Sequence, residues 1–236
     1  MLKFNIDSKK IRMKNILNTC IVVLLVLLTQ SCEKDEDTSI KDGDGNTYTS
    51  VQIGQQVWMK EDLKTTKYRN GDLIGTTVPA TLDITAEATP KYQWAYDGNE
   101  SNVATYGRLY TWNAVTDNRN VCPTGWHLPT DKEWTTLTTF LGGESVAGGK
   151  LKETGITHWP SPNTEATNES DFTALPSGYR DLNGEFSFFH SFGYWWSSTE
   201  STTTYAILRF VYSSFSNVYN GGSYMQNGFS VRCLQD

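Results

Sequence analysis

The order of hydrophobic and polar positions predicts several short strands in this chain of 236 residues. Thr49, Val51 and Ile53 alternate with polar residues, a two-residue turn follows, and the apolar residues 57–59 form a return strand. Further strand-like stretches are residues 172–175, 193–198, 206–212 and 228–234. Residues 60–90 are polar and show no sustained period, which is typical of an irregular loop.

One segment has the pattern of an amphipathic helix. Thr130 is a suitable N-cap, and Glu133 completes a capping box with it. Apolar residues then recur at helical spacing until two glycines end the pattern: Trp134, Leu137, Phe140 and Leu141, followed by Gly142 and Gly143. The sequence therefore predicts one main helix with one buried face, and a weaker second helix at residues 147–152.

The composition favours strands and loops over helices. The chain contains eight Trp, twelve Tyr and 19 Gly, and it lacks long Leu-rich helical stretches. We therefore expect an α+β domain with small antiparallel sheets, one main helix and long loops.

The N-terminal segment has the build of a secretory signal peptide. Its apolar run, residues 21–28, is far shorter than the roughly twenty residues that span a bilayer. Basic residues precede this run, and small or polar residues lead from it to Cys32. The pattern before Cys32 resembles the lipobox of bacterial lipoproteins, in which the cysteine is acylated, with palmitate as one of the acyl groups, and becomes the new N-terminus. An ordinary cleaved signal with an incidental cysteine is the alternative.

These features predict three parts of the chain: a signal peptide at 1–31, a lipidated tether at 32–41 and a folded domain at 42–236. The tether is charged and poor in apolar residues, so it cannot bury a core. Its acidic residues after Cys32 resemble the surface-export signal of Bacteroidota lipoproteins, which implies a lipid anchor on the outer face of the outer membrane. A merely solvated spacer is the alternative. The partner expected for this segment is the membrane, through the lipid.

Charge and cysteine content limit the partners further. Without residues 1–31 the chain keeps 15 basic and 25 acidic residues, and such an acidic surface repels nucleic acid. Only Cys122 and Cys233 remain after residue 32. In an oxidising compartment two cysteines are most simply one disulfide, and two buried free thiols are the alternative.

Four sequence words carry a family resemblance. They occur at 51–63 (VQIGQQVWMKEDL), 122–130 (CPTGWHLPT), 193–198 (GYWWSS) and 228–233 (GFSVRC). Together they resemble the Fibrobacter succinogenes major paralogous domain family of secreted and lipid-anchored bacterial proteins, over roughly residues 42–235. The family is defined by sequence, so this resemblance implies no particular activity.

The layout also resembles the C-type lectin-like superfamily. In that fold a helix after a Gly-Trp-x-Leu-Pro word packs on a loop-rich antiparallel sheet, and a C-terminal strand closes the domain. A long-range disulfide between the region before the helix and the last strand fits such a fold. The calcium site of true C-type lectins is not expected, because its Pro-containing loop is missing and the word at 112–114 lacks the acid.

Sequence motifs for catalysis and metal binding are also absent. The chain has no Gly-x-Ser-x-Gly elbow and no His-Glu-x-x-His word. Its three histidines have no acidic residue at a telling spacing. We therefore expect no catalytic residue, no metal site and no cofactor.

Aromatic residues are the best candidates for ligand binding. Trp195 and Trp196 are adjacent in a predicted strand, so their side chains must point to opposite faces of the sheet. One ring is then free to stack on a sugar or to grip a peptide, while burial of both is the alternative. Tyr205 and Arg209 are candidates to extend the same ligand surface.

The sequence thus predicts a non-enzymatic binding domain that adheres to glycans or to another surface protein. One alternative is an envelope glycan hydrolase with two carboxylates, for which the loose candidates are Glu169, Asp171, Glu185 and Glu200. A purely structural surface protein is the other alternative.

Overall fold

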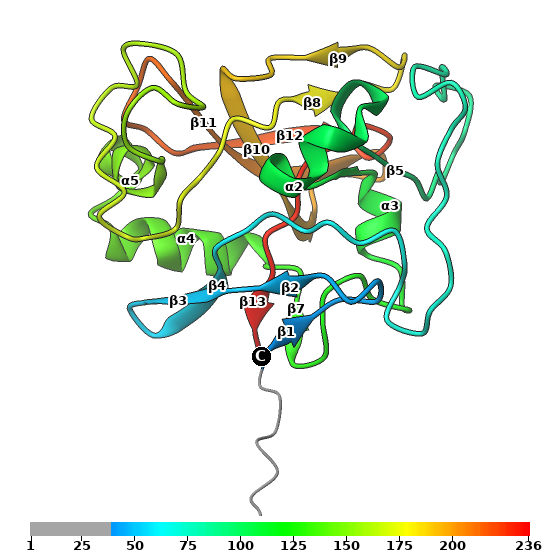
Figure 1. The fold of residues 1–236 in the computed structure, drawn as a ribbon, viewed down its shortest axis with the longest axis horizontal. Coiled ribbons are helices and arrows are strands. Elements are labelled where there is room, and N and C mark those ends of the chain that lie inside the picture. Colours follow the sequence, from blue (N-terminus) through cyan, green and yellow to red (C-terminus); the bar gives the residue numbers. More distant parts are fainter. Residues whose placement is uncertain (1–38) are drawn as a thin grey trace, which may run out of the picture. The chain divides into compact units, whose positions relative to one another are not determined.

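The largest sheet consists of three antiparallel strands in the order β10–β11–β12. These strands span Phe192–Glu200, Tyr205–Tyr212 and Tyr219–Tyr224 in a computed structural model that describes residues 39–236. Figure 1 shows this sheet in the part of the domain away from the C-terminus. The strands predicted at 193–198 and 206–212 are confirmed as β10 and β11, whereas the Gly-rich β12 has no predicted counterpart.

A second sheet brings distant parts of the chain together. Its order is β3–β4–β13–β7, with strands Ser50–Ile53, Gln56–Met59, Leu234–Gln235 and Trp126–His127. The predicted hairpin is confirmed: Val51 pairs with Trp58, and Gly54 takes a φ of 64° in the turn. This φ favours glycine because it has no Cβ. The C-terminal strand β13 then pairs with β4 through Leu234 and Trp58.

The main helix, α4 (Asp131–Phe140), begins at the predicted capping box. Thr130 Oγ1 accepts a hydrogen bond from the backbone N–H of Glu133, whose carboxylate accepts from the backbone N–H of Thr130. Trp134 and Leu137 are buried as predicted, but Phe140 is 63% exposed. The prediction for Phe140 was wrong because it lies six positions after Trp134, off the buried stripe. The weaker second helix is confirmed as α5 (Glu144–Leu151).

The remaining elements are short. They are β1 (Ile40–Lys41), β2 (Thr47–Tyr48), β5 (Gln93–Trp94), β6 (Leu109–Tyr110), β8 (Tyr179–Arg180), β9 (Phe186–Ser187), α2 (Val103–Tyr106), α3 (Trp112–Val115), and the 3-10 turns η1 (Tyr96–Gly98) and η2 (Glu100–Asn102). The strands pair antiparallel as β1–β2, β5–β6 and β8–β9. The α+β class with small antiparallel sheets is therefore confirmed.

Two predicted strands are largely irregular in the structure. Residues 172–175 make one isolated bridge, between Lys152 and Ala174. In the segment 228–234, Gly228, Phe229 and Ser230 make isolated bridges to three different neighbours. This segment threads between sheets, so only its end joins one. Phe229, Val231 and Cys233 are buried together as their shared face predicts, but Ser230 and Arg232 on the other face are buried too.

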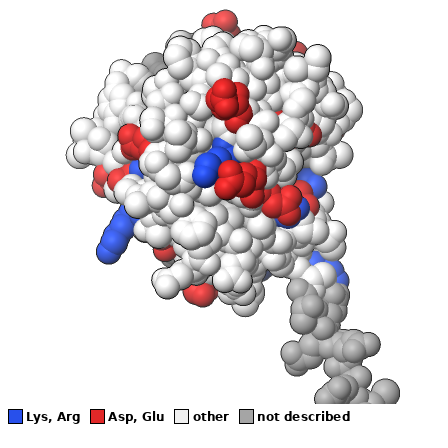
Figure 2. Space-filling view, turned by 90° about the vertical axis from the view of Figure 1, so that its left-hand side faces the viewer, with Lys and Arg blue, Asp and Glu red and all other residues white. Residues whose placement is uncertain are grey.

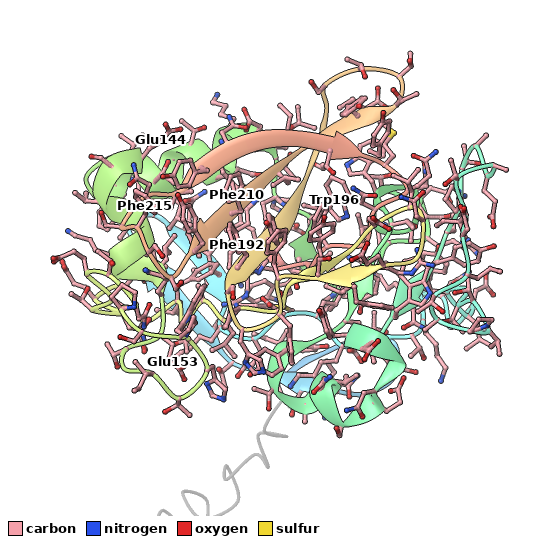
Figure 3. The ribbon with its side chains drawn as sticks, turned by 90° about the horizontal axis from the view of Figure 1, so that it is seen from above. Glu144, Glu153, Phe192, Trp196, Phe210 and Phe215 are labelled. Carbon is pink, nitrogen blue, oxygen red and sulfur yellow. A yellow bond between two sulfur atoms is a disulfide. The ribbon has the colours of Figure 1, made fainter. Side chains whose placement is uncertain are left out.

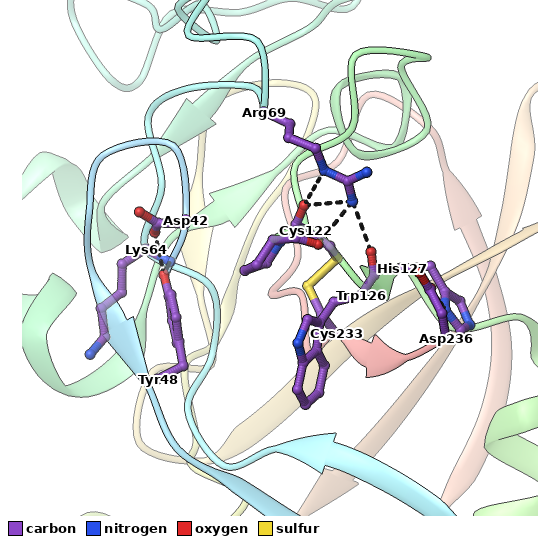
Figure 4. Close-up of a disulfide and its surroundings, with 10 residues drawn as sticks. Asp42, Tyr48, Lys64, Arg69, Cys122, Trp126, His127, Cys233 and Asp236 are labelled. Atoms are coloured by element: carbon purple, nitrogen blue, oxygen red, sulfur yellow. Dashed lines mark hydrogen bonds and ion pairs between the residues drawn. A yellow bond between two sulfur atoms is a disulfide. The ribbon is translucent and has the colours of Figure 1, made fainter. Parts of the chain in front are cut away.

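The predicted disulfide joins Cys122 to Cys233, whose Cα atoms are 6.0 Å apart. It fastens the loop before β7 to the residue before β13. Figure 4 shows Arg69 beside this bridge, where its guanidinium donates hydrogen bonds to the carbonyls of Cys122 and Trp126. The disulfide and the guanidinium of Arg69 together fix the loop that leads from Cys122 to β7.

The core has two hydrophobic clusters, one on each face of the β10–β11–β12 sheet. One contains Trp196 and Leu208, and the other contains Trp195 and Val211 with Trp134 of α4. Both clusters and the disulfide lie within residues 39–236. This segment therefore contains a complete core and is the unit that we expect to fold alone.

The N-terminal parts predicted from the sequence differ in how far the structure reaches them. The signal peptide at 1–31, Cys32 and most of the tether at 32–41 lie outside the described residues. The end of the predicted tether is wrong, because Ile40 and Lys41 form β1 and pair with β2. The fold therefore begins two residues before the predicted start at Asp42.

The helix packing gives a stability prediction. Trp134→Ala removes a ring that is 1% exposed, so we expect the free energy of unfolding to fall by about 3–5 kcal/mol. The matched control Phe140→Ala, on the same helix but exposed, should cost only about 0.5 kcal/mol. Urea unfolding of the two variants measures this difference. Equal losses would mean that the two rings have been assigned to the wrong faces.

Candidate functional site

The two tryptophans predicted for ligand binding are both in the core. Trp195 and Trp196 do point to opposite faces of β10, but they are only 2% and 0% exposed. Trp195 Nε1 donates to Asp62 Oδ1 at 2.8 Å, and Trp196 Nε1 donates to the carbonyl of Tyr110 at 2.8 Å. The predicted exposure of one ring was wrong because both faces of the sheet are covered at this point.

Arg209 and Tyr205 do not extend a ligand surface around these tryptophans. Arg209 is 1% exposed, and its Nη1 lies 2.6 Å from Asp131 Oδ1, so it fastens the sheet to α4. This prediction was also wrong, because the arginine faces the helix. Tyr205 is half-buried and packs against Tyr224, with ring centroids 4.4 Å apart. The register places Tyr205 near the end of the sheet opposite Tyr212.

A different set of rings is partly open on the same sheet, and we call it the aromatic face. It consists of Phe188, Phe192, Tyr194, Phe210, Tyr212, Phe215 and Tyr219. The register pairs Phe192 with Tyr212, Tyr194 with Phe210, and Phe210 with Tyr219. Figure 3 shows Phe192 and Phe210 on neighbouring strands, with Phe215 on one side of them and Trp196 on the other.

Four of these rings form a continuous row. The centroid distances are 4.8 Å from Phe188 to Phe192, 4.7 Å from Phe192 to Tyr212, and 4.8 Å from Tyr212 to Phe215. The inner pair is stacked, with 13° between the ring planes. The end rings are the open ones, since Phe188 is 51% and Phe215 is 46% exposed. The row therefore leaves an aromatic surface at each end for a ligand to contact.

The backbone around Phe188 is held in an unusual conformation. Phe188 and His190 have φ values of 59° and 60°, which residues other than glycine rarely adopt. Phe189 between them turns inward and stacks on Tyr96, with centroids 4.2 Å apart. Such strain costs of order 1–3 kcal/mol per residue and is found most often at functional sites. Here it accompanies the exposure of Phe188.

The other end of the row is fixed by a buried lysine. Lys152 is 0% exposed, and its ammonium donates to the carbonyls of Thr164 (3.0 Å), Tyr212 (3.2 Å), Ser213 (3.4 Å) and Phe215 (2.9 Å). Ser213 and Phe215 belong to the turn after β11, and Tyr212 is the last residue of that strand. The lysine thus positions the turn that carries Phe215, and burial lowers its pKa to about 8.

The four loose carboxylate candidates occupy different surroundings. Asp171 Oδ2 lies 2.7 Å from Lys60 Nζ, and Glu169 Oε1 lies 3.4 Å from Lys150 Nζ. Glu185 lies between β8 and β9, and Glu200 ends β10; both are exposed. On the side of the molecule in Figure 2, acidic and basic side chains are interspersed on a largely uncharged surface. Neither sign forms a continuous patch on that side.

The three histidines have hydrogen-bond partners of their own. His127 Nδ1 lies 2.8 Å from Asp236 Oδ1, His158 Nδ1 lies 2.8 Å from Glu153 Oε2, and His190 Nδ1 lies 3.2 Å from the hydroxyl of Tyr106. Within residues 39–236, no group of three or more His, Cys, Asp or Glu side chains is arranged to hold a metal ion.

The aromatic face was missed although the sequence contains its signal. Phe192 and Tyr194 are two residues apart in β10, and so are Phe210 and Tyr212 in β11. Each pair therefore lies on one face of its strand. Pairing these two alternations across the hairpin would have identified the ring pairs. Sequence alone could not show where the cover over this face ends, because the covering residues come from other segments.

Comparison with known proteins gives one match. The model of the Fibrobacter succinogenes major domain family matches residues 51–235. No curated protein and no solved structure matches the chain.

The buried lysine predicts a pH dependence of stability. Because its pKa is about 8 in the fold and about 10.4 when unfolded, only the unfolded chain binds this proton between those values. The free energy of unfolding should therefore rise by about 1–2 kcal/mol from pH 7.5 to pH 9.5. Urea unfolding across this range measures the rise. Lys152→Met should remove it, whereas Lys150→Met, a more exposed neighbour, should keep it. Equal slopes in both variants would contradict this role of Lys152.

Proposed function

From the premise that this chain belongs to the Fibrobacter succinogenes major domain family, we propose that it is a lipid-anchored envelope protein that binds a glycan. The ligand lies on the aromatic face. The observation that carries this proposal is the row of rings from Phe188 to Phe215, whose two ends are about half exposed.

The chemistry of the aromatic face favours an uncharged, hydroxyl-bearing ligand. Its seven members are all phenylalanine or tyrosine, so the face supplies apolar surface together with phenol groups. The hydroxyls of Tyr212 and Tyr219 lie 3.4 Å apart at one edge of the row. Sugar rings present both C–H surfaces and hydroxyls, so they match this combination. A protein surface is the other ligand class that rings of this kind accept.

Binding without catalysis is the function that the surroundings support best. Asp171 and Glu169 each have a lysine partner, whereas Glu185 lies in the turn between β8 and β9 and Glu200 ends β10. The proposal therefore assigns no catalytic residue and no cofactor. The acidic composition of the chain supports a partner other than nucleic acid.

The envelope location rests on the sequence. The short apolar run before Cys32 and the acidic residues after it support acylation and attachment to the outer membrane, on its outer face. Within residues 39–236, no helix is both long and apolar enough to span a bilayer. The order of main helix, small sheets and closing C-terminal strand supports the further proposal of a C-type lectin-like fold.

The binding proposal predicts a separation of binding from stability. Phe188→Ala and Phe215→Ala should each weaken glycan binding by about 1–3 kcal/mol, since truncation of an aromatic anchor has this effect. Both rings are about half exposed, so the unfolding free energy should change by only about 1 kcal/mol. A glycan array with the 39–236 segment finds the ligand, and calorimetry with that ligand measures the losses.

Tyr224→Ala is the matched control, because Tyr224 is 43% exposed on β12, at the end of the sheet away from the row. It should bind as the wild type does. An equal loss in Tyr224→Ala would place the ligand elsewhere. Capture of a protein but of no glycan would replace the proposed ligand class.

The anchoring proposal predicts a change in membrane attachment. Cys32→Ala removes the thiol that carries the lipid, so the protein should move from the detergent phase to the aqueous phase on Triton X-114 partitioning. Cys20→Ala is the control, since Cys20 lies within the segment expected to be cleaved. Retention of the Cys32→Ala protein in the detergent phase would rule out this anchor.

A further inference from the structure

A hollow in the surface lies apart from the aromatic face. Its volume is about 340 Å³, within the range of small-molecule sites. The residues that matter for its chemistry are Lys60, Glu61, Asp62, Thr105, Thr173 and Arg232. They come from the segment after β4, from α2, from the loop before β8 and from the segment before β13. We call this hollow the Asp62 cleft.

Only one of the two carboxylate oxygens of Asp62 has hydrogen-bond partners. Its Oδ1 accepts from Trp195 Nε1 at 2.8 Å and from Arg232 Nε at 2.7 Å, and Arg232 Nη2 lies 2.6 Å from the same oxygen. The side chain of Asp62 is 2% exposed, and its Oδ2 has no hydrogen-bond partner among residues 39–236. A buried oxygen without a partner costs about 1–3 kcal/mol or more, so a donor from outside the chain is expected there.

The two cations that line the cleft are already paired within the chain. Lys60 Nζ lies 2.7 Å from Asp171 Oδ2, and Arg232 is paired with Asp62. Glu61 accepts from the hydroxyl and the backbone N–H of Thr49 at 2.7 Å and 2.8 Å. Among the described residues that line the cleft, no cation is therefore left over for an anionic ligand, whereas an uncharged hydroxyl group can donate to the Glu61 carboxylate as that of Thr49 does.

The protonation state of Asp62 limits the chemical class of the ligand further. Burial raises the pKa of Asp62, and the positive charge of Arg232 opposes this rise. An ionised Oδ2 needs a donor, whereas a protonated Oδ2 needs an acceptor. A hydroxyl group serves both states, because its oxygen both donates and accepts.

The backbone supports a function for the same place. Thr173 lines the cleft with a φ of 55°, and Asp171, two residues earlier in the chain, has a φ of 58°. For a β-branched residue such as threonine this conformation is a genuine outlier. Strain of this kind persists where the surrounding structure requires it, often at ligand sites.

We propose that the Asp62 cleft binds one hydroxyl-rich, uncharged unit such as a monosaccharide, with a hydroxyl against Asp62 Oδ2. This site is separate from the aromatic face, and the inference does not depend on the function proposed above. The cleft holds a single small unit, whereas the row of rings is open at both ends.

The indole of Trp195 reports on this site because it donates to the same carboxylate. We would titrate the ¹⁵N-labelled 39–236 segment with glucose, galactose, mannose and N-acetylglucosamine, each up to about 50 mM, a range suited to weak binding. The Trp195 indole resonance is assigned from Trp195→Phe. At least one sugar should shift this resonance saturably, while the indole of Trp94, which is bonded to Thr77, stays in place.

Two variants on α2 make the test specific. Thr105 and Ala104 are both exposed, but only Thr105 lines the cleft. Thr105→Phe fills the cleft and should weaken the response at least about ten-fold, whereas Ala104→Phe should change it less than about two-fold. Phe215→Ala should leave the response intact, which separates this site from the aromatic face. A Trp195 indole that no sugar shifts, or that shifts equally in Thr105→Phe, would overturn the proposal.

Discussion

The fold depends on one buried ion pair, between Arg232 and Asp62. Both side chains are almost fully buried, at 1% and 2% exposure. The remaining donor of the guanidinium, Nη1, reaches the carbonyls of Lys60 and Phe172 at 2.6 Å each. Removing one member of such a pair leaves a buried charge without compensation, at a cost of about 3–5 kcal/mol. The ion pair and these hydrogen bonds therefore join three irregular segments, which contain Asp62, Phe172 and Arg232, without regular secondary structure.

The face of the β10–β11–β12 sheet that carries Trp196 is core at one end and partly exposed at the other, because other segments cover only part of it. Near Trp196 the face is closed by Phe229 and Tyr110, whereas near Phe192 and Tyr212 it is partly open. The open rings bury one another, and aromatic pairs add about 0.5–1.5 kcal/mol each beyond their buried area. Partial exposure is thus tolerated, and apolar surface remains available to a ligand.

The sequence was sufficient for local structure and insufficient for long-range contacts. The hairpin at Gly54, the capping box of α4 and the α+β class follow from periodicity and turn chemistry within short windows. The Cys122–Cys233 bridge followed from there being only two candidates. The exposure of Trp195 and Arg209 was misjudged because both depend on partners, Asp62 and Asp131, that lie far away in the chain. The four sequence motifs that carried the resemblance contain Asp62, Cys122, Trp195 and Arg232. They lie side by side in the fold, because Asp62 contacts Trp195 and Arg232, and Cys122 is bonded to Cys233.

The disulfide would have a mechanical consequence under the proposed N-terminal lipid anchor. The loop that it closes contains the whole aromatic face and the helices α4 and α5, while β1 to α3 lie outside it. A pulling force that enters at Ile40 and leaves through a ligand on β10 reaches Cys122 before it reaches the sheet. Residues 40–121 can then extend fully, whereas beyond Cys122 the bridge makes the two arms of its loop share the load and limits their lengthening. The proposed binding surface would keep its shape under a load that unravels the part of the fold before Cys122.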